Sequence, residues 1–135
     1  MRSEISASFL LSGDQLDPNE VTAATGIEPT ASHRAGDVIT YPRRTLRAAA
    51  GRWWVESSLP LSASLDAHVK ELLNHLEPAW PALIALGEVY KAELSCLVRS
   101  YGGDRPPIGF DSQMVRRCAE LSADIDVDLY IFDDD

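Results

Sequence analysis

The histidines and cysteines of this chain are the side chains best suited to hold a metal ion or to assist a nucleophile. They are His33, His68, His75, Cys96 and Cys118. His68 and His75 lie seven residues apart in one expected helix, or roughly 10.5 Å along its axis, so one metal ion cannot bind both. The cysteines lack Cys-x-x-Cys spacing and fall in apolar segments, which favours buried, reduced thiols. We therefore expect no metal site, no cofactor and no catalytic residue in a familiar motif.

The stretch from Gly13 to Glu20 is rich in acidic residues, which could act as a general acid or as metal ligands. Helix capping accounts for most of them, because Asp17 precedes Pro18 and Glu20 stands three residues after the cap. An EF-hand loop needs acids at alternating positions and a distal bidentate glutamate, and this spacing is absent. The stretch is interpreted as the start of a helix.

Arginines between residues 28 and 52 suggest a second kind of chemistry, the binding of an anion. The candidate anion site consists of Arg34, Arg43, Arg44 and Arg47, with Arg52, His33 and Tyr41 nearby in the sequence. Guanidinium groups recognise carboxylates and phosphates through paired hydrogen bonds. No P-loop accompanies them, since Gly102 and Gly103 are not followed by its lysine. A solvated flexible loop is the alternative interpretation.

Charged residues alternate with apolar ones along the expected strands, which places them on one face of a sheet. The candidate interaction surface consists of Glu56, Lys91, Glu93, Asp126, Asp128 and Trp53. A negative sheet face attracts a basic protein in a salt-dependent way. The alternative is that these charges keep an exposed sheet in solution and discourage edge pairing.

Strands and helices must position these residues, and the hydrophobic pattern predicts where they lie. Alternation of apolar and polar residues predicts strands at 5–11, 52–57, 90–98 and 125–132. Spacings of three and four predict a helix that opens at Ser62 or Ser64, with apolar positions as far as Trp80, and that ends or kinks at Pro78 and Pro81. A second short helix is expected to stop at Gly87, and capping signals predict helices at Pro18–Thr25 and after Asp111.

The predicted fold is a single α+β domain spanning residues 1–135. We expect an antiparallel or mixed four-stranded sheet with helices on one face, in the order β-α-β-(α)-β-α-β. The two halves are of comparable size, which indicates a pseudo-duplicated, ferredoxin-like arrangement. Residues 28–51 form a long connection with one extended piece at Val38–Tyr41, and residues 133–135 an acidic, solvated tail.

The composition is that of a globular protein, with 45% hydrophobic and 24% charged residues among 135. The net charge of −9 falls entirely within residues 55–135, because residues 1–54 hold as many arginines as acids. Nucleic acid is therefore not an expected partner. No apolar run approaches the roughly 20 residues of a membrane span, and the N-terminus lacks the apolar core of a signal peptide, so we expect a cytoplasmic protein.

The run Ala7–Thr22, followed by Gly26–Thr30 and Arg34–Asp37, resembles an uncharacterised bacterial family known as domain of unknown function 4279. Gly51–Trp54, the leucine-rich central helix and Asp126–Tyr130 are similar too, so the resemblance spans nearly the whole chain. The resemblance implies a self-contained domain and assigns no activity to any residue.

These observations favour a small cytoplasmic protein-binding module, of an immunity or inhibitor type, that uses an acidic sheet face to bind a basic protein. A ligand-sensing domain that binds a small anion near the arginine-rich loop is the alternative. An enzyme with an unrecognised site is a further alternative, and formation of a homodimer through the sheet stays open.

Overall fold

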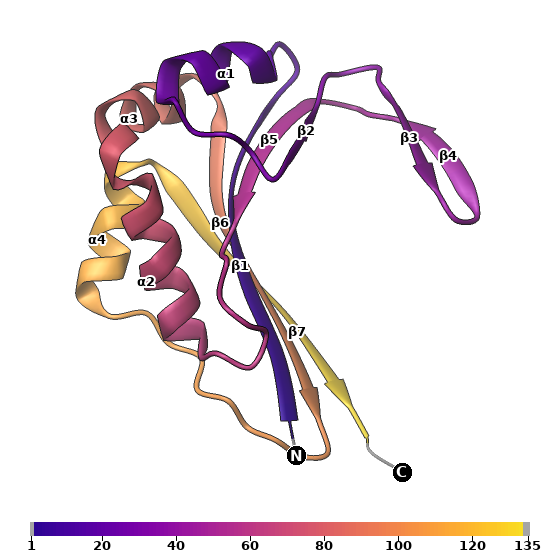
Figure 1. Ribbon diagram of the computed structural model, residues 1–135, viewed down its shortest axis with the longest axis vertical. Coiled ribbons are helices and arrows are strands. Elements are labelled where there is room, and N and C mark those ends of the chain that lie inside the picture. The colour runs from indigo at the N-terminus through magenta and orange to yellow at the C-terminus, as the bar shows by residue number, and fades with distance from the viewer. Residues whose placement is uncertain (1, 134–135) are drawn as a thin grey trace.

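The strand expected at residues 5–11 is the central strand of the sheet in the computed structural model, which describes residues 2–133 (Figure 1). In chain order, the elements are β1 (Arg2–Gly13), α1 (Pro18–Thr25), β2 (Ala31–His33), β3 (Val38–Tyr41), β4 (Arg44–Arg47), β5 (Gly51–Glu56), α2 (Leu65–Leu76), the 3-10 helix η1 (Glu77–Ala79), α3 (Trp80–Val89), β6 (Lys91–Tyr101), α4 (Ser112–Glu120) and β7 (Ala123–Phe132). The α+β prediction is confirmed. The expected acidic tail extends to Asp134 and Asp135, which lie outside the described residues.

The main sheet is mixed and has the strand order β2-β5-β1-β6-β7. β1 pairs antiparallel with both β5 and β6, whereas β7 pairs parallel with β6. The sheet has five strands rather than the expected four, because the short β2 adds to the outer side of β5. The ferredoxin-like duplication is not confirmed, because the first half closes with an antiparallel neighbour and the second with a parallel one.

The helices all lie on one face of this sheet (Figure 1). Odd-numbered residues of β1 from Ile5 to Leu11 point to that face and are buried, as the period of two requires. The buried face of α2 contributes Leu65, Val69, Leu72, Leu73 and Leu76. Burial of each large aliphatic side chain stabilises the fold by about 1.5–3 kcal/mol. The core therefore lies between this face and the helical layer.

Side-chain caps fix where three of the helices begin. Asp17 accepts a hydrogen bond from the Asn19 amide, as expected for the first helix. Ser64, rather than Ser62, caps α2, and Asp111 accepts from the Met114 amide at the start of α4. These short polar side chains satisfy backbone N–H groups that have no partner in the first helical turn.

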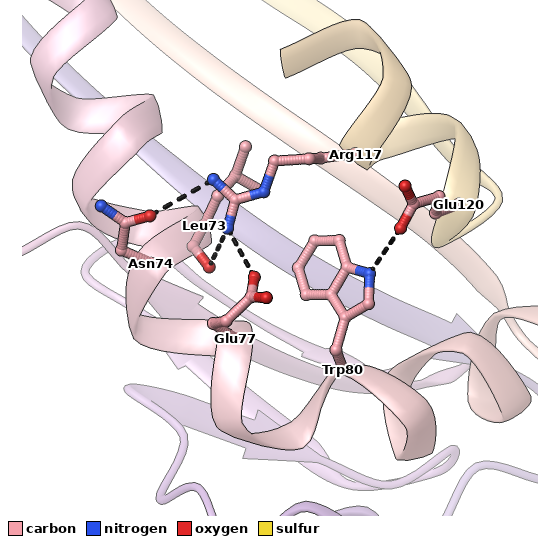
Figure 2. Close-up of polar contacts among 6 residues, drawn as sticks. All are labelled: Leu73, Asn74, Glu77, Trp80, Arg117 and Glu120. Carbon is pink, nitrogen blue, oxygen red and sulfur yellow. Dashed lines mark hydrogen bonds and ion pairs between the residues drawn. The ribbon is translucent and has the colours of Figure 1, made fainter. Parts of the chain in front are cut away.

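Arg117 fastens α4 to the end of α2 (Figure 2). Its guanidinium donates to the Leu73 carbonyl oxygen at 3.1 Å and pairs with Glu77 at 2.7 Å, and it lies over the Trp80 ring. The Trp80 indole in turn donates to Glu120 on α4 at 2.8 Å. Because α4 connects β6 to β7, these contacts also fix the position of the connection between these two parallel strands.

Residues 28–51 contain more regular structure than the sequence indicates. Besides β2, this segment forms a hairpin of β3 and β4, which is a two-stranded sheet of its own. Its base is closed by backbone hydrogen bonds that join Gly36 and Asp37 to Ala48, each 2.8 Å long. None of residues 38–47 is buried, which explains why the hydrophobic pattern detects only the first strand. Among residues 2–133, no helix has the length and apolarity needed to span a membrane.

Gly87 does not end a helix, contrary to the expectation. α3 continues through Val89, and Gly87 instead marks the point where α3 presses against the turn after α4. A β-carbon at Gly87 would overlap the backbone carbonyl oxygen of Leu121. Glycine is needed here because of a close approach between backbones.

Gly87→Ala should therefore destabilise the protein, although alanine forms helix better than glycine by up to about 1 kcal/mol. Steric overlap with a backbone atom cannot be relieved by a rotamer change, so we expect a net loss of about 1–3 kcal/mol. Urea denaturation measures this loss. Gly109→Ala is the matched control, because no atom lies within 4 Å of its added β-carbon. A Gly87→Ala protein as stable as the wild type would contradict the packing.

Candidate functional site

The face of the sheet turned away from the helices, here called the open face, carries the even-numbered residues of β1. The strand register aligns them in rows, so that Ser12 lies between Arg52 and Lys91. In the next row Leu10 lies between Trp54 and Glu93. The described helices all cover the other face (Figure 1). Side chains of the open face are thus the ones the main sheet can offer to a partner or ligand.

Four carboxylates gather where β6 and β7 meet, and we call this group the acidic edge. It consists of Glu93, Asp124, Asp126 and Asp128. Glu93 pairs in register with Asp124, at a strand spacing of about 4.8 Å, and the three aspartates follow at every second residue of β7. β7 is an edge strand that pairs only with β6 in the described part of the chain. The acidic edge therefore borders unpaired backbone groups.

Glu56 is on the same face but lies apart from the acidic edge. It pairs with Ser8, Ser8 with Ser95, and Ser95 with Asp126, so three strand spacings, about 14 Å, separate the two carboxylates. This exceeds the screening length of about 8 Å at physiological salt. Glu56 thus adds little to the field at β7.

Trp53 does not belong to the open face, which corrects the candidate interaction surface. Its side chain is fully buried toward the helices, and its indole nitrogen donates to the Thr22 hydroxyl at 3.1 Å. Its neighbour Trp54 takes the open face, where Arg52 lies over its ring. Adjacent residues of a strand point to opposite faces, so one of the two tryptophans must point toward the helices. Thr22 accepts the hydrogen bond of the buried indole N–H.

The last four residues of β7, Leu129–Phe132, are large, apolar and exposed, and we call them the apolar end. Their exposed fractions are 47%, 50%, 71% and 42% in chain order. On the open face, Phe132 stacks on Tyr101 with ring centres 5.0 Å apart, and Arg2 lies over Tyr101. On the other face, Leu129 and Ile131 extend beyond what the helices cover. The apolar end is therefore exposed on both faces of the edge strand.

A groove of about 560 Å³ lies between the β3–β4 hairpin and the opposite end of the open face. Leu10 and Ser12 belong to its floor, and Ile39, Tyr41 and Leu46 of the hairpin line its other side. Three cationic side chains, Arg47, Arg52 and Lys91, line it together with one carboxylate, Glu93. We call the three cations the basic cluster.

The structure brings only one of the four candidate arginines into this groove. Arg34 forms an ion pair with Asp17 at 2.8 Å, and Arg44 lies over the Tyr41 ring. Arg43 occupies the turn of the hairpin and does not line the groove. Arg47 lines the groove and donates to the Gly36 carbonyl oxygen at 3.1 Å. Arg52 and Lys91 on the sheet complete the cationic lining.

His33 lines the same groove and packs edge-on against Trp54. Its Nδ1 is buried without a hydrogen-bond partner, and no other buried side-chain nitrogen or oxygen in residues 2–133 is in that state. A buried polar atom without a partner costs about 1–3 kcal/mol. The groove therefore contains a polar side chain whose hydrogen bonding the fold leaves incomplete.

Ser57 and His68 lie in the geometry of a nucleophile and its base, which the sequence did not indicate. The Ser57 hydroxyl is 2.6 Å from Nδ1 of His68, and Nε2 is 3.0 Å from the Pro60 carbonyl oxygen. A carbonyl oxygen only accepts, so the proton is on Nε2 and Ser57 donates to Nδ1. Ser57 also accepts from the Ala7 amide, and His68 is fully buried. The pair therefore joins the segment before α2 to β1 as a structural contact.

Both cysteines are buried and free, as predicted. Burial raises the pKa of the Cys96 thiol to about 12, with smaller contributions from Cys118 and Asp126, and burial also raises the pKa of Cys118. A thiol reacts as its thiolate, so neither sulfur is prepared for nucleophilic chemistry. In the described chain, no three His, Cys, Asp or Glu side chains lie close enough together to hold a metal ion.

Native protein at about pH 8 should therefore resist modification by a disulfide reagent such as DTNB. A rise of the pKa from 9.0 to about 12 lowers the thiolate fraction of Cys96 about 1,000-fold. The pKa of Cys96 is higher in the folded protein than in the unfolded chain, so the buried, protonated thiol contributes to the free energy of unfolding below about pH 9. This contribution is lost as the pH rises from about 9 to about 12. Rapid absorbance change with native protein would contradict the burial, and protein unfolded in guanidinium is the control.

Sequence reasoning missed some residues of the open face for identifiable reasons. Asp124 lies outside the predicted strand, which begins at Ile125, whereas β7 begins at Ala123 and the spacing Asp124-Asp126-Asp128 is itself a strand signal. The pattern does not indicate a role for Leu10, because it is the one apolar residue among the even-numbered residues of β1. No local signal indicates that Arg47 and Lys91 line the same groove, since the groove arises where the hairpin meets the sheet.

Comparison with known proteins identifies a family but no activity. Neither a curated protein nor a solved structure matches the chain. A family model described as a domain of unknown function matches nearly the whole chain, which confirms the resemblance noted in the sequence. The chain therefore belongs to the family described as Domain of unknown function (DUF4279), whose model matches residues 3–132.

Proposed function

We propose that this domain binds a partner protein by adding a basic β-strand of that partner to the edge of β7. The observation that carries the proposal is the exposure of the apolar end on both faces of an unpaired edge strand. Natural proteins protect such edges with short strands, charges or coverings, and an uncovered apolar edge invites pairing. The opposite edge strand, β2, has three residues and so presents little to pair with.

The acidic edge sets the chemistry of the partner strand. A strand placed beside β7 would gain main-chain hydrogen bonds along its length, and its alternate side chains would face Asp124, Asp126 and Asp128. Lysine or arginine at those positions would neutralise the carboxylates, whereas acidic residues would be repelled. On the other face, apolar residues would cover Leu129 and Ile131. The preferred partner therefore alternates basic with apolar residues.

The electrostatic part of this binding also affects its rate. A chain with a net charge of −9 and four carboxylates along one edge attracts a cationic surface before contact, which raises the association rate at low salt. Occlusion of a basic functional surface on the partner would make the domain an inhibitor or immunity-type protein. Inhibition of a basic protein is therefore the biological role that we propose.

Synthetic peptides of about ten residues test it directly. A peptide that alternates lysine with valine should bind and should slow hydrogen exchange of β7 amides, whereas the same peptide with glutamate in place of lysine should not. Calorimetry at about 0.05 M and about 0.5 M salt should show weaker binding at the higher concentration. Equal binding of both peptides, or exchange protection confined to segments other than β7, would overturn the proposal.

Charge reversal identifies the carboxylates responsible. The double variant Asp124→Lys with Asp126→Lys should weaken binding of the lysine peptide about tenfold, because two exposed charge pairs become repulsive. Glu56→Lys is the matched control, since it makes the same kind of change on the same face but about 14 Å from Asp126. The alternative outcome is a dimer that does not bind the peptide and that the Ile131→Lys substitution dissociates. It would show that the edge of β7 pairs with a second copy of this chain instead.

A further inference from the structure

We infer that the groove beneath the β3–β4 hairpin binds a small organic anion with an apolar or aromatic body. This site lies at the other end of the open face from the apolar end, and the one residue it shares with the acidic edge is Glu93. A volume of about 560 Å³ is within the range of small-molecule sites. A second, smaller hollow lined by Ser8, Trp54 and Ser95 shares Leu10 and Arg52 with it, so the concave surface continues along the sheet.

The charge of the groove is opposite to that of the whole molecule. In a chain with net charge −9, the charged side chains that line the groove are the three cations of the basic cluster and one carboxylate. Ion pairs in the described chain join Arg34 to Asp17, Lys70 to Asp66 and Arg117 to Glu77. The basic cluster takes part in none of them. Its three positive charges are therefore not neutralised by an ion pair within the described chain.

The register places two of these cations around a hydroxyl. Ser12 pairs with Arg52 on one side and with Lys91 on the other, so the two cations start about 10 Å apart across the sheet with Ser12 between them. Arg47 enters from the hairpin. A carboxylate or phosphate bound over Ser12 would accept hydrogen bonds from more than one charged donor, the arrangement that binds anions most strongly.

The remaining lining selects a ligand with an apolar body. Leu10, Ile39, Leu46 and the Tyr41 ring provide apolar surface beside the basic cluster. Inorganic phosphate alone would leave this surface wet, and a neutral molecule of the same shape would leave the cations without a partner. Glu93 lies two residues from Lys91 on the same face and repels the anion, so it limits affinity and disfavours ligands with several negative charges.

Thermal denaturation of the full chain with matched probes tests the inference. Phenylacetate and phenyl phosphate distinguish a preference for carboxylate from one for phosphate. Two half-probes serve as controls: phenylacetamide lacks the negative charge, and inorganic phosphate lacks the apolar body. An aromatic anion at ten times its dissociation constant should raise Tm by about 3–6 °C, and the two half-probes should not. No shift with either aromatic anion, or equal shifts with the half-probes, would overturn the inference.

Three single variants and a control locate the site. Lys91→Gln and Arg52→Gln should each weaken binding of the aromatic anion about tenfold or more, because each removes a charged donor. Glu93→Gln should strengthen it about threefold, because it removes a repelling charge. Arg43→Gln is the control, since Arg43 belongs to the same hairpin but lies outside the groove. Binding that is lost in Arg43→Gln and kept in Lys91→Gln would contradict the assigned geometry.

Discussion

The whole structure depends on the alternation of β1, the strand that pairs with β6 from Arg2 to Ser12 and with β5 from Ser8 to Gly13. Its odd-numbered residues from Ile5 to Leu11 are buried under the helices, and its even-numbered residues must then point to the opposite face. A shift of register by one residue would exchange the two sets and expose the core. The composition of the open face is thus a direct consequence of how the core is packed.

Charge on the open face is distributed unevenly along the strands. The row nearest the hairpin holds Arg52 and Lys91 of the basic cluster, and the carboxylates of β7 lie along the edge. One face can therefore attract groups of opposite charge at two places. Glu93 belongs to both, because it pairs with Asp124 and also lines the groove.

Local signals in the sequence were sufficient for the elements that bury apolar residues or carry caps. The four long strands, the caps at Asp17 and Asp111, and the buried face of α2 follow from alternation, capping and helical spacing. The parallel pairing of β7 and the added strand β2 do not, because pairing depends on contacts between residues far apart in the chain. Which of Trp53 and Trp54 is buried was likewise decided by tertiary contacts, with Thr22 and the helices on one side.

The hairpin has a consequence for how the fold can diversify. It forms its own small sheet, contributes no buried residue between 38 and 47, and is closed at its base by backbone hydrogen bonds that join Gly36 and Asp37 to Ala48. Insertions, deletions and substitutions in it therefore cost the core little free energy. Related chains can keep one scaffold while changing the hairpin that stands over the sheet, so the shape of the groove can change without a change in the core.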